Sequence, residues 1–487
     1  MTAAAVTTRR GRFEVGPLAP IQEGMLFESL SRSRPGLYVS QVSCVLAGGL
    51  DPAAFAATWA RLVARHAALR TGFLWEQAPQ PVQVVLDEVA VPLGVEDWRD
   101  LPAAEASRRA AELLAGERRR GFDLSRPPLF RLVLVRLAED RWRFAWTYHH
   151  LLLDGWSEAV VLREMGLVYP ALAGGREAPL PPARPYADFV RWVHAQDLAA
   201  AEAFWRGALG DFRRPTPLGG RPEEDGAAAE VRARVDAAAA AGLRRLAAGA
   251  RVTLGTVVQG LWAAFLARLA GERDVVFGLT VAGRPAGLAG AEAMVGVFIN
   301  TLPVRVRLPA AGPFAEWLRR LQDDVAAARR FEHTPLAEVQ RWSGVPRGTR
   351  LFDSLLVFQN TPDDAAEPGG RHLVEVEEGA FQGGPTAYPL SLDVEPAAEL
   401  AITLTYDTAR FTRETVAGWA ESFAALAAAA GRGAIGDVAD LDARLDEIER
   451  SGRRRREDET AALLRARLGQ ARRRAVAANP REEMSLR

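Results

Sequence analysis

Segments with strand and helix patterns are interspersed along the chain without a strict strand–helix–strand alternation. Helical spacing of apolar residues is clear after Asp51, a good N-cap that is followed by Pro52 at the first helical position. Two β-rich runs separated by residues 138–141 predict a hairpin. Further strands are expected at 38–46, 82–91, 274–281, 298–307, 351–360, 390–396 and 400–407. This mixture favours an α/β fold with mixed sheets over a doubly wound parallel sheet.

The chain has 487 residues, which is more than one core usually organises, so we expect two lobes. The stretch 173–184 is rich in Gly, Pro and Ala, and 176–186 is interpreted as the linker between them. Charge dominates from residue 436 onward, where Leu441 and Leu445 are expected to dock. The predicted division is therefore a leader at 1–16, an N-terminal lobe at 17–175, a C-terminal lobe at 187–435 and a charged tail at 436–487. One helix is expected over 187–207.

Composition excludes several classes of protein. Sixty-one basic residues balance 61 acidic ones, which gives no overall attraction to nucleic acid or to an anionic membrane. Every basic residue is arginine, so lysine-based Schiff-base or phosphate-loop chemistry is excluded. Cys44 is the only cysteine, which rules out an internal disulfide. With neither a signal peptide nor a run of about 18 apolar residues, we expect a cytoplasmic protein.

Two of the six histidines, His149 and His150, stand together at the end of a predicted strand. Because neighbouring strand residues point to opposite faces, one ring can face a cavity while the other packs inward. An imidazole with a pKa near 6.5 can accept a proton at neutral pH. Asp154 follows within one turn, just before Gly155, which permits a tight turn. Its carboxylate can orient the imidazole or hold the loop.

Alternative roles for the histidine pair stay open. The pair could simply satisfy the core or a turn. A metal site is not expected, because adjacent histidines cannot readily share one ion and no third His or Cys stands nearby in sequence. No Gly-x-Ser-x-Gly elbow supports a serine nucleophile.

The sequence His149-His150-x-x-x-Asp154-Gly155 resembles the signature of condensation domains of nonribosomal peptide synthetases, relatives of chloramphenicol acetyltransferase. Six further blocks resemble family motifs and occur in family order: 18–26, 65–73, 186–189, 295–302, 333–336 and 352–358. The resemblance extends from about residue 17 to residue 430. It implies two acetyltransferase-like lobes that form a V-shaped pseudo-dimer with a tunnel between them.

The resemblance also implies an activity. Family members transfer an acyl or aminoacyl group from a phosphopantetheine thioester to an amine and form an amide bond in peptide natural-product biosynthesis. Carrier proteins deliver these substrates at the donor and acceptor mouths of the tunnel. No intrinsically bound cofactor is expected. The acceptor is carrier-bound or a small diffusible amine or alcohol.

Roles for single residues follow from the matched motifs. His150 is expected to be the catalytic residue, which deprotonates or orients the attacking amine, and backbone N–H groups near Gly155 are expected to stabilise the oxyanion. His149 and Asp154 are expected to be structural. The partner of Asp154 is expected to be Arg284, with Arg65 as a second candidate. Residues expected near the tunnel or the substrate are Gln22, Arg70, Trp156, Ser157 and Asn300.

The chain also departs from the family pattern. No adenylation domain follows, and the Gly219-Gly220 pair lacks the serine of a carrier attachment sequence. We therefore expect a freestanding protein or an excised domain. Three alternative functions stay open: ester formation on an alcohol, epimerisation by the same fold, and non-catalytic recruitment of carriers. The retained second histidine argues against the last.

Overall fold

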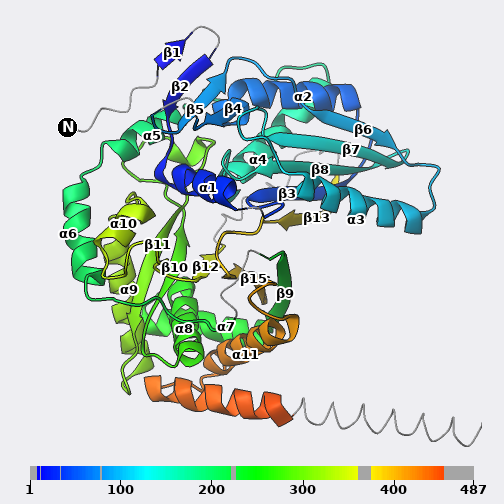
Figure 1. The fold of residues 1–487 in the computed structure, drawn as a ribbon. Helices are drawn as coiled ribbons and strands as arrows, with labels where there is room; N and C mark the ends of the chain where they lie inside the picture. Colours follow the sequence, from blue (N-terminus) through cyan, green and yellow to red (C-terminus); the bar gives the residue numbers. More distant parts are fainter. Residues whose placement is uncertain are drawn as a thin grey trace, which may run out of the picture.

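The computed structural model describes residues 8–10, 13–32, 34–76, 79–220, 226–359 and 375–454, which form two α/β halves (Figure 1). Each half contains a mixed sheet with helices packed against it, which confirms the predicted α/β architecture. The first half lies at the top of Figure 1 and the second half below it.

The first half is built from a five-stranded sheet and a smaller four-stranded sheet. Its elements are β1 (Thr8–Arg10), β2 (Phe13–Pro17), α1 (Pro20–Ser31), β3 (Val39–Ala47), α2 (Pro52–Arg65), β4 (Thr71–Leu74), β5 (Val82–Leu86), β6 (Leu93–Asp97), α3 (Ala103–Arg120), β7 (Phe130–Ala138), β8 (Arg141–His149) and α4 (Gly155–Ala173). The larger sheet has the order β13-β3-β8-β7-β6, and the smaller one β1-β2-β5-β4.

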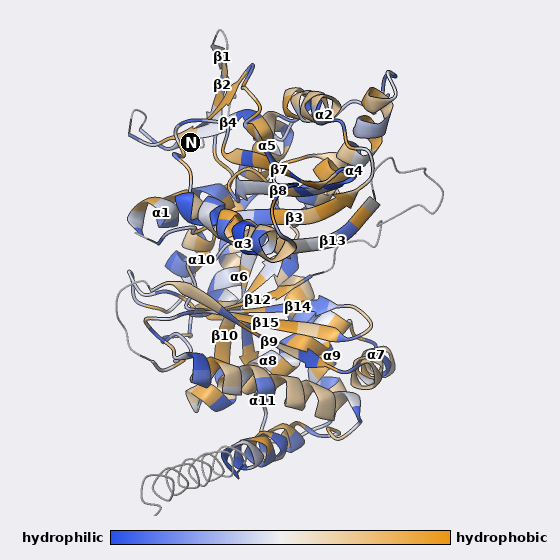
Figure 2. Cartoon of the chain, turned by 90° about the vertical axis from the view of Figure 1, so that its right-hand side faces the viewer, coloured by the Kyte–Doolittle hydropathy of each residue, from blue (hydrophilic) through white to orange (hydrophobic). Residues whose placement is uncertain are grey.

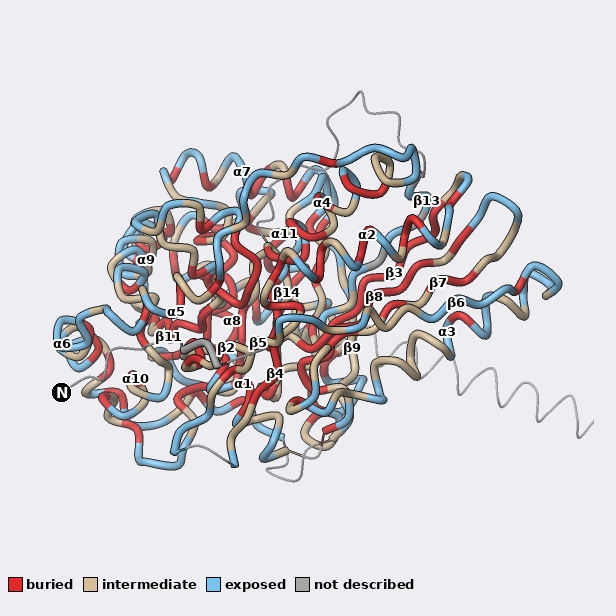
Figure 3. Tube along the Cα trace, turned by 90° about the horizontal axis from the view of Figure 1, so that it is seen from above, coloured by how far each residue is buried: buried red, intermediate tan, exposed pale blue. Residues whose placement is uncertain are grey.

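The two faces of β8 have different surroundings because its side chains alternate. Phe144, Trp146 and Tyr148 join the main core of the first half, where Trp59 of α2 packs edge-on against Trp146. His149 points to the opposite face of the sheet. Figure 3 shows β3 and β8 largely buried, whereas β6 and α3 at the rim are more exposed. The strand that carries the histidine pair is therefore held rigidly on both sides.

The second half contains a six-stranded sheet with the order β11-β10-β12-β14-β15-β9. The elements of this part of the chain are α5 (Ala187–His194), α6 (Leu198–Leu209), β9 (Ala228–Val235), α7 (Ala237–Ala250), α8 (Leu254–Ala270), β10 (Asp274–Val281), β11 (Asn300–Arg307), α9 (Phe314–Arg329), α10 (Leu336–Trp342), β12 (Ser354–Phe358), β13 (Glu375–Gln382), β14 (Leu390–Pro396), β15 (Leu400–Asp407) and α11 (Arg413–Gly431). Of these, β13 belongs to the five-stranded sheet of the first half.

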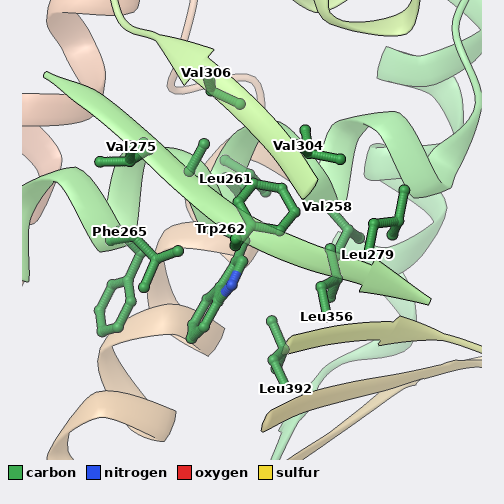
Figure 4. Close-up of a cluster of buried hydrophobic side chains, with 14 of the residues drawn as sticks. Val258, Leu261, Trp262, Phe265, Val275, Leu279, Val304, Val306, Leu356 and Leu392 are labelled. Carbon is green, nitrogen blue, oxygen red and sulfur yellow. The ribbon is translucent and has the colours of Figure 1, made fainter. Parts of the chain in front are cut away.

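Helices α7, α8, α9 and α11 cover one face of the six-stranded sheet. Trp262 of α8 lies at the centre of this core, with Leu279 of β10, Leu356 of β12 and Leu392 of β14 around it (Figure 4). In Figure 2, the layer of α7, α8, α9 and α11 lies on the side of the sheet away from the first half. The opposite face of the sheet is therefore directed toward the first half.

Strand β13 connects the two halves. It follows β12 in sequence, yet it pairs antiparallel with β3, from Glu375 opposite Ala47 to Gln382 opposite Gln41 (Figure 2). The range 187–435, which the sequence assigns wholly to the C-terminal lobe, thus supplies an edge strand to the first sheet. The sequence analysis expected no strand here.

Several expected boundaries are corrected. Residues 13–16, assigned to the leader, belong to β2, which pairs with β5. The helix expected over 187–207 is broken, because the Asp197 side chain accepts the N–H of Ala199 and caps a new helix that begins at Leu198. The strand expected over 82–91 ends at Leu86.

The start of the predicted tail docks as expected. Leu441 and Leu445 are buried in the core of the second half. The rest of the tail beyond residue 454 lies outside the described residues. Among the helices described, none is by itself long and apolar enough to cross a membrane; α7 and α8 pass that test only as a pair bent by 103°.

Candidate active site

His149 ends strand β8 and is buried. Its Nδ1 accepts a hydrogen bond from the backbone N–H of Leu151 over 3.2 Å, and the rings of Tyr38 and Phe122 contact it edge-on. Burial, together with the neighbouring imidazole of His150, lowers the pKa of His149 to about 3. A neutral ring that accepts a backbone hydrogen bond from Leu151 holds the turn after β8.

His150 is the first residue beyond β8. Its backbone N–H donates to the carbonyl of Tyr38 over 2.7 Å, which fixes the residue against the start of β3. The residue is half-buried, and its Nδ1 is buried and has no hydrogen-bond partner among the described residues. Burial lowers the pKa of His150, although nearby backbone groups and the carboxylate of Asp154 oppose this shift. The imidazole is therefore neutral at pH 7 and able to accept a proton.

Asp154 anchors the loop that follows the histidine pair. Its Oδ1 accepts the backbone N–H of Ser157 over 2.8 Å, which makes it the N-cap of α4. Its Oδ2 accepts the backbone N–H of Phe298 over 2.9 Å, and its own N–H donates to the carbonyl of Gly296. One carboxylate thus joins the start of α4 to the segment that precedes β11.

Arg284 completes this junction. Its Nη2 lies 3.2 Å from Oδ1 of Asp154 and donates to Oγ of Ser157 over 2.7 Å. Its Nη1 donates to the carbonyl of Met294 over 3.1 Å, and the guanidinium lies 3.9 Å from the centre of the Phe298 ring. The contact expected between Asp154 and Arg284 is present.

Arg65, the second candidate partner of Asp154, is placed elsewhere. Its Nε donates to Glu164 over 2.9 Å, and Nε2 of His66 lies 2.8 Å from the same carboxylate oxygen. Both groups belong to the packing of α2 against α4. The expectation for Arg65 is wrong because a nearer carboxylate on the facing helix satisfies it.

Ser157 is fully engaged within the protein. Its Oγ donates to the carbonyl of Gly296 over 2.7 Å and lies 3.1 Å from the backbone N of the same residue. Ser157 lies in the first turn of α4, whose N-cap is Asp154. Its substrate-side role stays a prediction.

Gly155 does not serve a tight turn. It is the first residue of α4 and is exposed, without a positive φ, and an added Cβ would meet nothing within 4 Å. Its backbone N–H makes no hydrogen bond within the described residues. The start of α4 thus presents a free donor beside the histidine loop, where the helix dipole favours negative charge.

Gln22 and Trp156 support the loop from two sides. Gln22 accepts the N–H of Ala19 through Oε1 and donates through Nε2 to the carbonyl of Leu151, each over 2.9 Å. Trp156 donates through Nε1 to the carbonyl of Glu292 over 2.9 Å. These contacts give both residues a supporting role, and substrate contact stays a prediction.

Asn300 and Arg70 are engaged with the backbone. Asn300 donates through Nδ2 to the carbonyls of Glu332 and Thr334, and its Oδ1 accepts the N–H of Thr301. Arg70 donates through Nε to the carbonyl of Val63 over 3.0 Å. Their predicted substrate-side roles are untested by these contacts.

Gly296, Tyr186 and Phe298 are parts of the junction to which the sequence analysis gave no individual role. A Cβ on Gly296 would lie 2.0 Å from the Tyr186 ring, whose hydroxyl bonds the carbonyl of Val297. A Cβ on Gly283 would lie 1.7 Å from the Phe298 carbonyl. Tyr186 stands in the block 186–189 and Gly296 and Phe298 stand in the block 295–302, and membership of these motif-like blocks was their signal in the sequence.

A cavity of about 540 Å³ is lined in part by Tyr186 and Val295, next to this junction. Arg65, Arg70, Arg184 and Tyr186 contribute to its wall, whereas His150 does not. Within the described part of the chain, no cluster of three His, Cys, Asp or Glu side chains is placed to hold a metal ion.

Comparisons with known proteins agree on one family. The profile described as "Condensation domain" matches residues 14–444. A linear gramicidin synthase protein of Brevibacillus parabrevis is 44% identical over 402 residues, which cover 81% of this chain and 8% of that protein. Chondramide synthase cmdD of Chondromyces crocatus is 38% identical over 392 residues, covering 78% of this chain and 10% of that protein. The chain thus spans a tenth or less of these relatives.

Solved structures show the same fold. The X-domain from teicoplanin biosynthesis has a TM-score of 0.74 at 24% identity and covers 90% of this chain and 99% of that one. A mutant starter condensation domain of rhizomide synthetase RzmA, in complex with C8-CoA, has a TM-score of 0.73 at 20% identity and covers 87% and 96%.

Proposed function

The chain belongs to the condensation-domain family, and from this premise we propose that it transfers an acyl or aminoacyl group from a carrier-bound phosphopantetheine thioester to an amine. The product is an amide in the assembly of a peptide-type natural product. The similarity to linear gramicidin synthase and chondramide synthase supports this substrate class.

The observation that carries the proposal is the state of His150. Its imidazole is neutral, its backbone is fixed to Tyr38, and the residue as a whole is half-buried. A neutral imidazole held in one place is the group that general-base catalysis requires. We assign the proton-accepting role to Nε2, because Nδ1 is buried against the protein.

The proposed step conserves atoms and charge. The amine nitrogen attacks the thioester carbonyl carbon, and His150 accepts or orients the proton that the nitrogen loses. The tetrahedral oxyanion then collapses, the C–S bond breaks, and the phosphopantetheine sulfur leaves and takes up the proton. The backbone N–H of Gly155 is the donor we assign to the oxyanion, in keeping with the dipole of α4.

Asp154 and Arg284 act on this step indirectly. Their ion pair and the backbone hydrogen bonds of Asp154 join the histidine loop to the segment before β11. A loop fixed in this way keeps the imidazole oriented between substrates, which lowers the entropic cost of the reaction. Neither residue is assigned a proton-transfer role.

Carrier proteins are the proposed partners, and phosphopantetheine is part of the substrate rather than a resident cofactor. The acceptor is a carrier-bound or a diffusible amine. The cytoplasm, where such carriers are loaded, is the proposed location.

The test offers acyl-loaded carrier proteins to the purified chain with an amine and, separately, with an alcohol of the same carbon skeleton. Mass spectrometry then follows transfer. Amide product that His150→Ala abolishes supports the proposal. Ester product alone, or deuterium exchange at the donor α-carbon without transfer, overturns it in favour of ester formation or epimerisation. Transfer that persists in His150→Ala removes the assigned role.

A further inference from the structure

Strand β14 has one apolar face and one polar face. Leu390, Leu392 and Val394 pack into the helix-covered core, and Figure 4 shows Leu392 on that side. Strand alternation therefore turns Ser391 and Asp393 to the opposite face of the sheet. That face is the one directed toward the first half of the molecule.

Contacts between the two halves confirm this direction. Ser391 Oγ lies 3.1 Å from Oγ1 of Thr386, whose carbonyl accepts a hydrogen bond from Arg34 of the first half. Asp407, on the same face of neighbouring β15, lies 3.9 Å from Arg34. The polar face of the sheet is thus a wall that faces the first half.

This wall is open to solvent in a graded way. Along β14, Ser391 is buried, Asp393 is half-buried and Glu395 is exposed. Thr403 of β15 lies beside Asp393 in register, and it is half-buried as well. The row therefore leads from the outside toward the interior between the halves.

Asp393 lacks a partner on this wall. None of the described residues makes a hydrogen bond or ion pair with its carboxylate, whereas nearby Glu230 of β9 lies 3.2 Å from Nη2 of Arg232. Burial, and the negative charge of Glu230, raise the pKa of Asp393 to about 7. A half-buried carboxylate that receives no hydrogen bond from the protein has little to stabilise its charged form, and a positively charged ligand would supply that stabilisation.

The position of Asp393 restricts which cation it can bind. Asp393 lies on β14 of the second half, whereas His150 follows β8 of the first half. A carboxylate also favours the protonated, non-nucleophilic form of an amine. The attacking amine must be neutral, so the ligand is a different group.

We propose that Asp393 is a specificity-determining residue that binds the ammonium group of a basic side chain on one of the two substrates. Side-chain ammonium fits better than an α-amine, because the α-carbon lies next to the thioester and hence near His150. This inference rests on the proposed transfer function, whose substrate class it narrows.

The test compares N-acetylcysteamine thioesters of lysine and norleucine, which differ only in the side-chain amine. One arm offers them as donors with a fixed neutral acceptor, and the other as acceptors with a fixed neutral donor. We expect the ratio of kcat/KM for lysyl over norleucyl substrate to exceed ten in one arm and to fall at least tenfold in Asp393→Asn and in Asp393→Thr. The control Glu395→Gln, an exposed carboxylate on the same strand, should keep the ratio. A ratio that neither Asp393 variant alters overturns the proposal.

A binding measurement tests the cation site independently of the proposed transfer function. In His150→Ala protein, which is designed not to turn over, the lysyl thioester should raise the melting temperature more than the norleucyl thioester. Adding Asp393→Asn should remove the difference. A second outcome is that transfer fails in every assay while the lysyl thioester still raises the melting temperature more than the norleucyl thioester, in a way that depends on Asp393. That result would support the cation site and overturn the transfer function. Equal shifts from both thioesters overturn the cation site.

Discussion

Arg284 and Asp154 form an ion pair between residues 130 positions apart, with Nη2 of the arginine 3.2 Å from Oδ1 of the aspartate. The side chains are only 7% and 1% exposed, so solvent screens their attraction little. Around this pair the start of α4 and the segment before β11 share hydrogen bonds with both residues.

Removal of either partner should destabilise the fold strongly. Arg284→Ala and Asp154→Ala each leave a buried charge without its partner, at a cost of about 3–5 kcal/mol. The free energy of unfolding, measured in urea, should fall by this amount. Arg108→Ala, which removes an exposed arginine paired on the surface of α3, is the matched control and should change little. An Asp154 variant as stable as that control would contradict the structural role.

Substitution of His150 should reduce activity, whereas substitution of His149 should reduce stability. His150→Ala is expected to lower kcat by about 10²–10⁴-fold through loss of the base. Its melting temperature should stay near that of the wild type, because the buried Nδ1 makes no hydrogen bond within the described residues. His149→Ala should instead lower stability, since it deletes the acceptor of the Leu151 N–H. Equal losses of stability in both variants would argue against this division.

The rate should depend on pH through His150. The neutral imidazole is the active form, so kcat/KM falls as pH drops through its pKa. Burial lowers that pKa, which places half-maximal activity below pH 6.5. A profile of kcat/KM between pH 5 and 9 checks this, and His150→Ala should lack the acidic limb. An acidic limb centred above pH 6.5 would contradict a buried base.

Acid should destabilise the protein in part through His149. Its pKa is about 3 in the folded state and near 6.5 when unfolded. The unfolded chain therefore binds the proton first, and stability is lost as pH falls from about 6.5 toward 3. The contribution is about 1.4 kcal/mol per pH unit. Urea unfolding at pH 7, 6 and 5 should give a shallower pH dependence for His149→Asn than for the wild type. Parallel curves would rule out this contribution.

A methyl group on Gly296 should disturb the junction. The new Cβ would lie 2.0 Å from the Tyr186 ring, so ring or backbone must shift. Overpacking of this kind costs typically about 1–3 kcal/mol. Gly287→Ala, in the segment that leads into the same junction but with nothing within 4 Å of the added Cβ, is the control. Circular dichroism melting compares the two. A Gly296→Ala protein as stable as Gly287→Ala would show that the ring yields freely.

Local patterns predicted much of the fold. Helix α2 begins at Pro52 after the Asp51 cap, and β10, β14 and β15 have the expected bounds. These elements carry regular apolar periods and clear end signals. Strand β13 was missed because its sequence is acidic and its partner β3 is more than 300 positions away. Pairing at that separation leaves no local signal.

The site was predictable where chemistry and motif coincide. The histidine pair and the Asp154–Arg284 contact follow from motif resemblance, and both groups lie together in the structure. Arg65 was misjudged because Glu164, on a helix that only the fold brings near, satisfies it. Asp393 was overlooked because a single acid in an apolar strand looks like an ordinary solvent-facing residue in sequence.

Strand β13 ties the halves together through main-chain hydrogen bonds rather than side chains alone. Wide separation of the two halves would break all the main-chain hydrogen bonds between β13 and β3, whereas a rotation about β13 would keep them. We therefore expect any opening motion that lets substrates enter to be a rotation about the paired strands β13 and β3. A fragment ending before residue 375 would lack the strand altogether, and β3 would be left as a bare edge, prone to self-association.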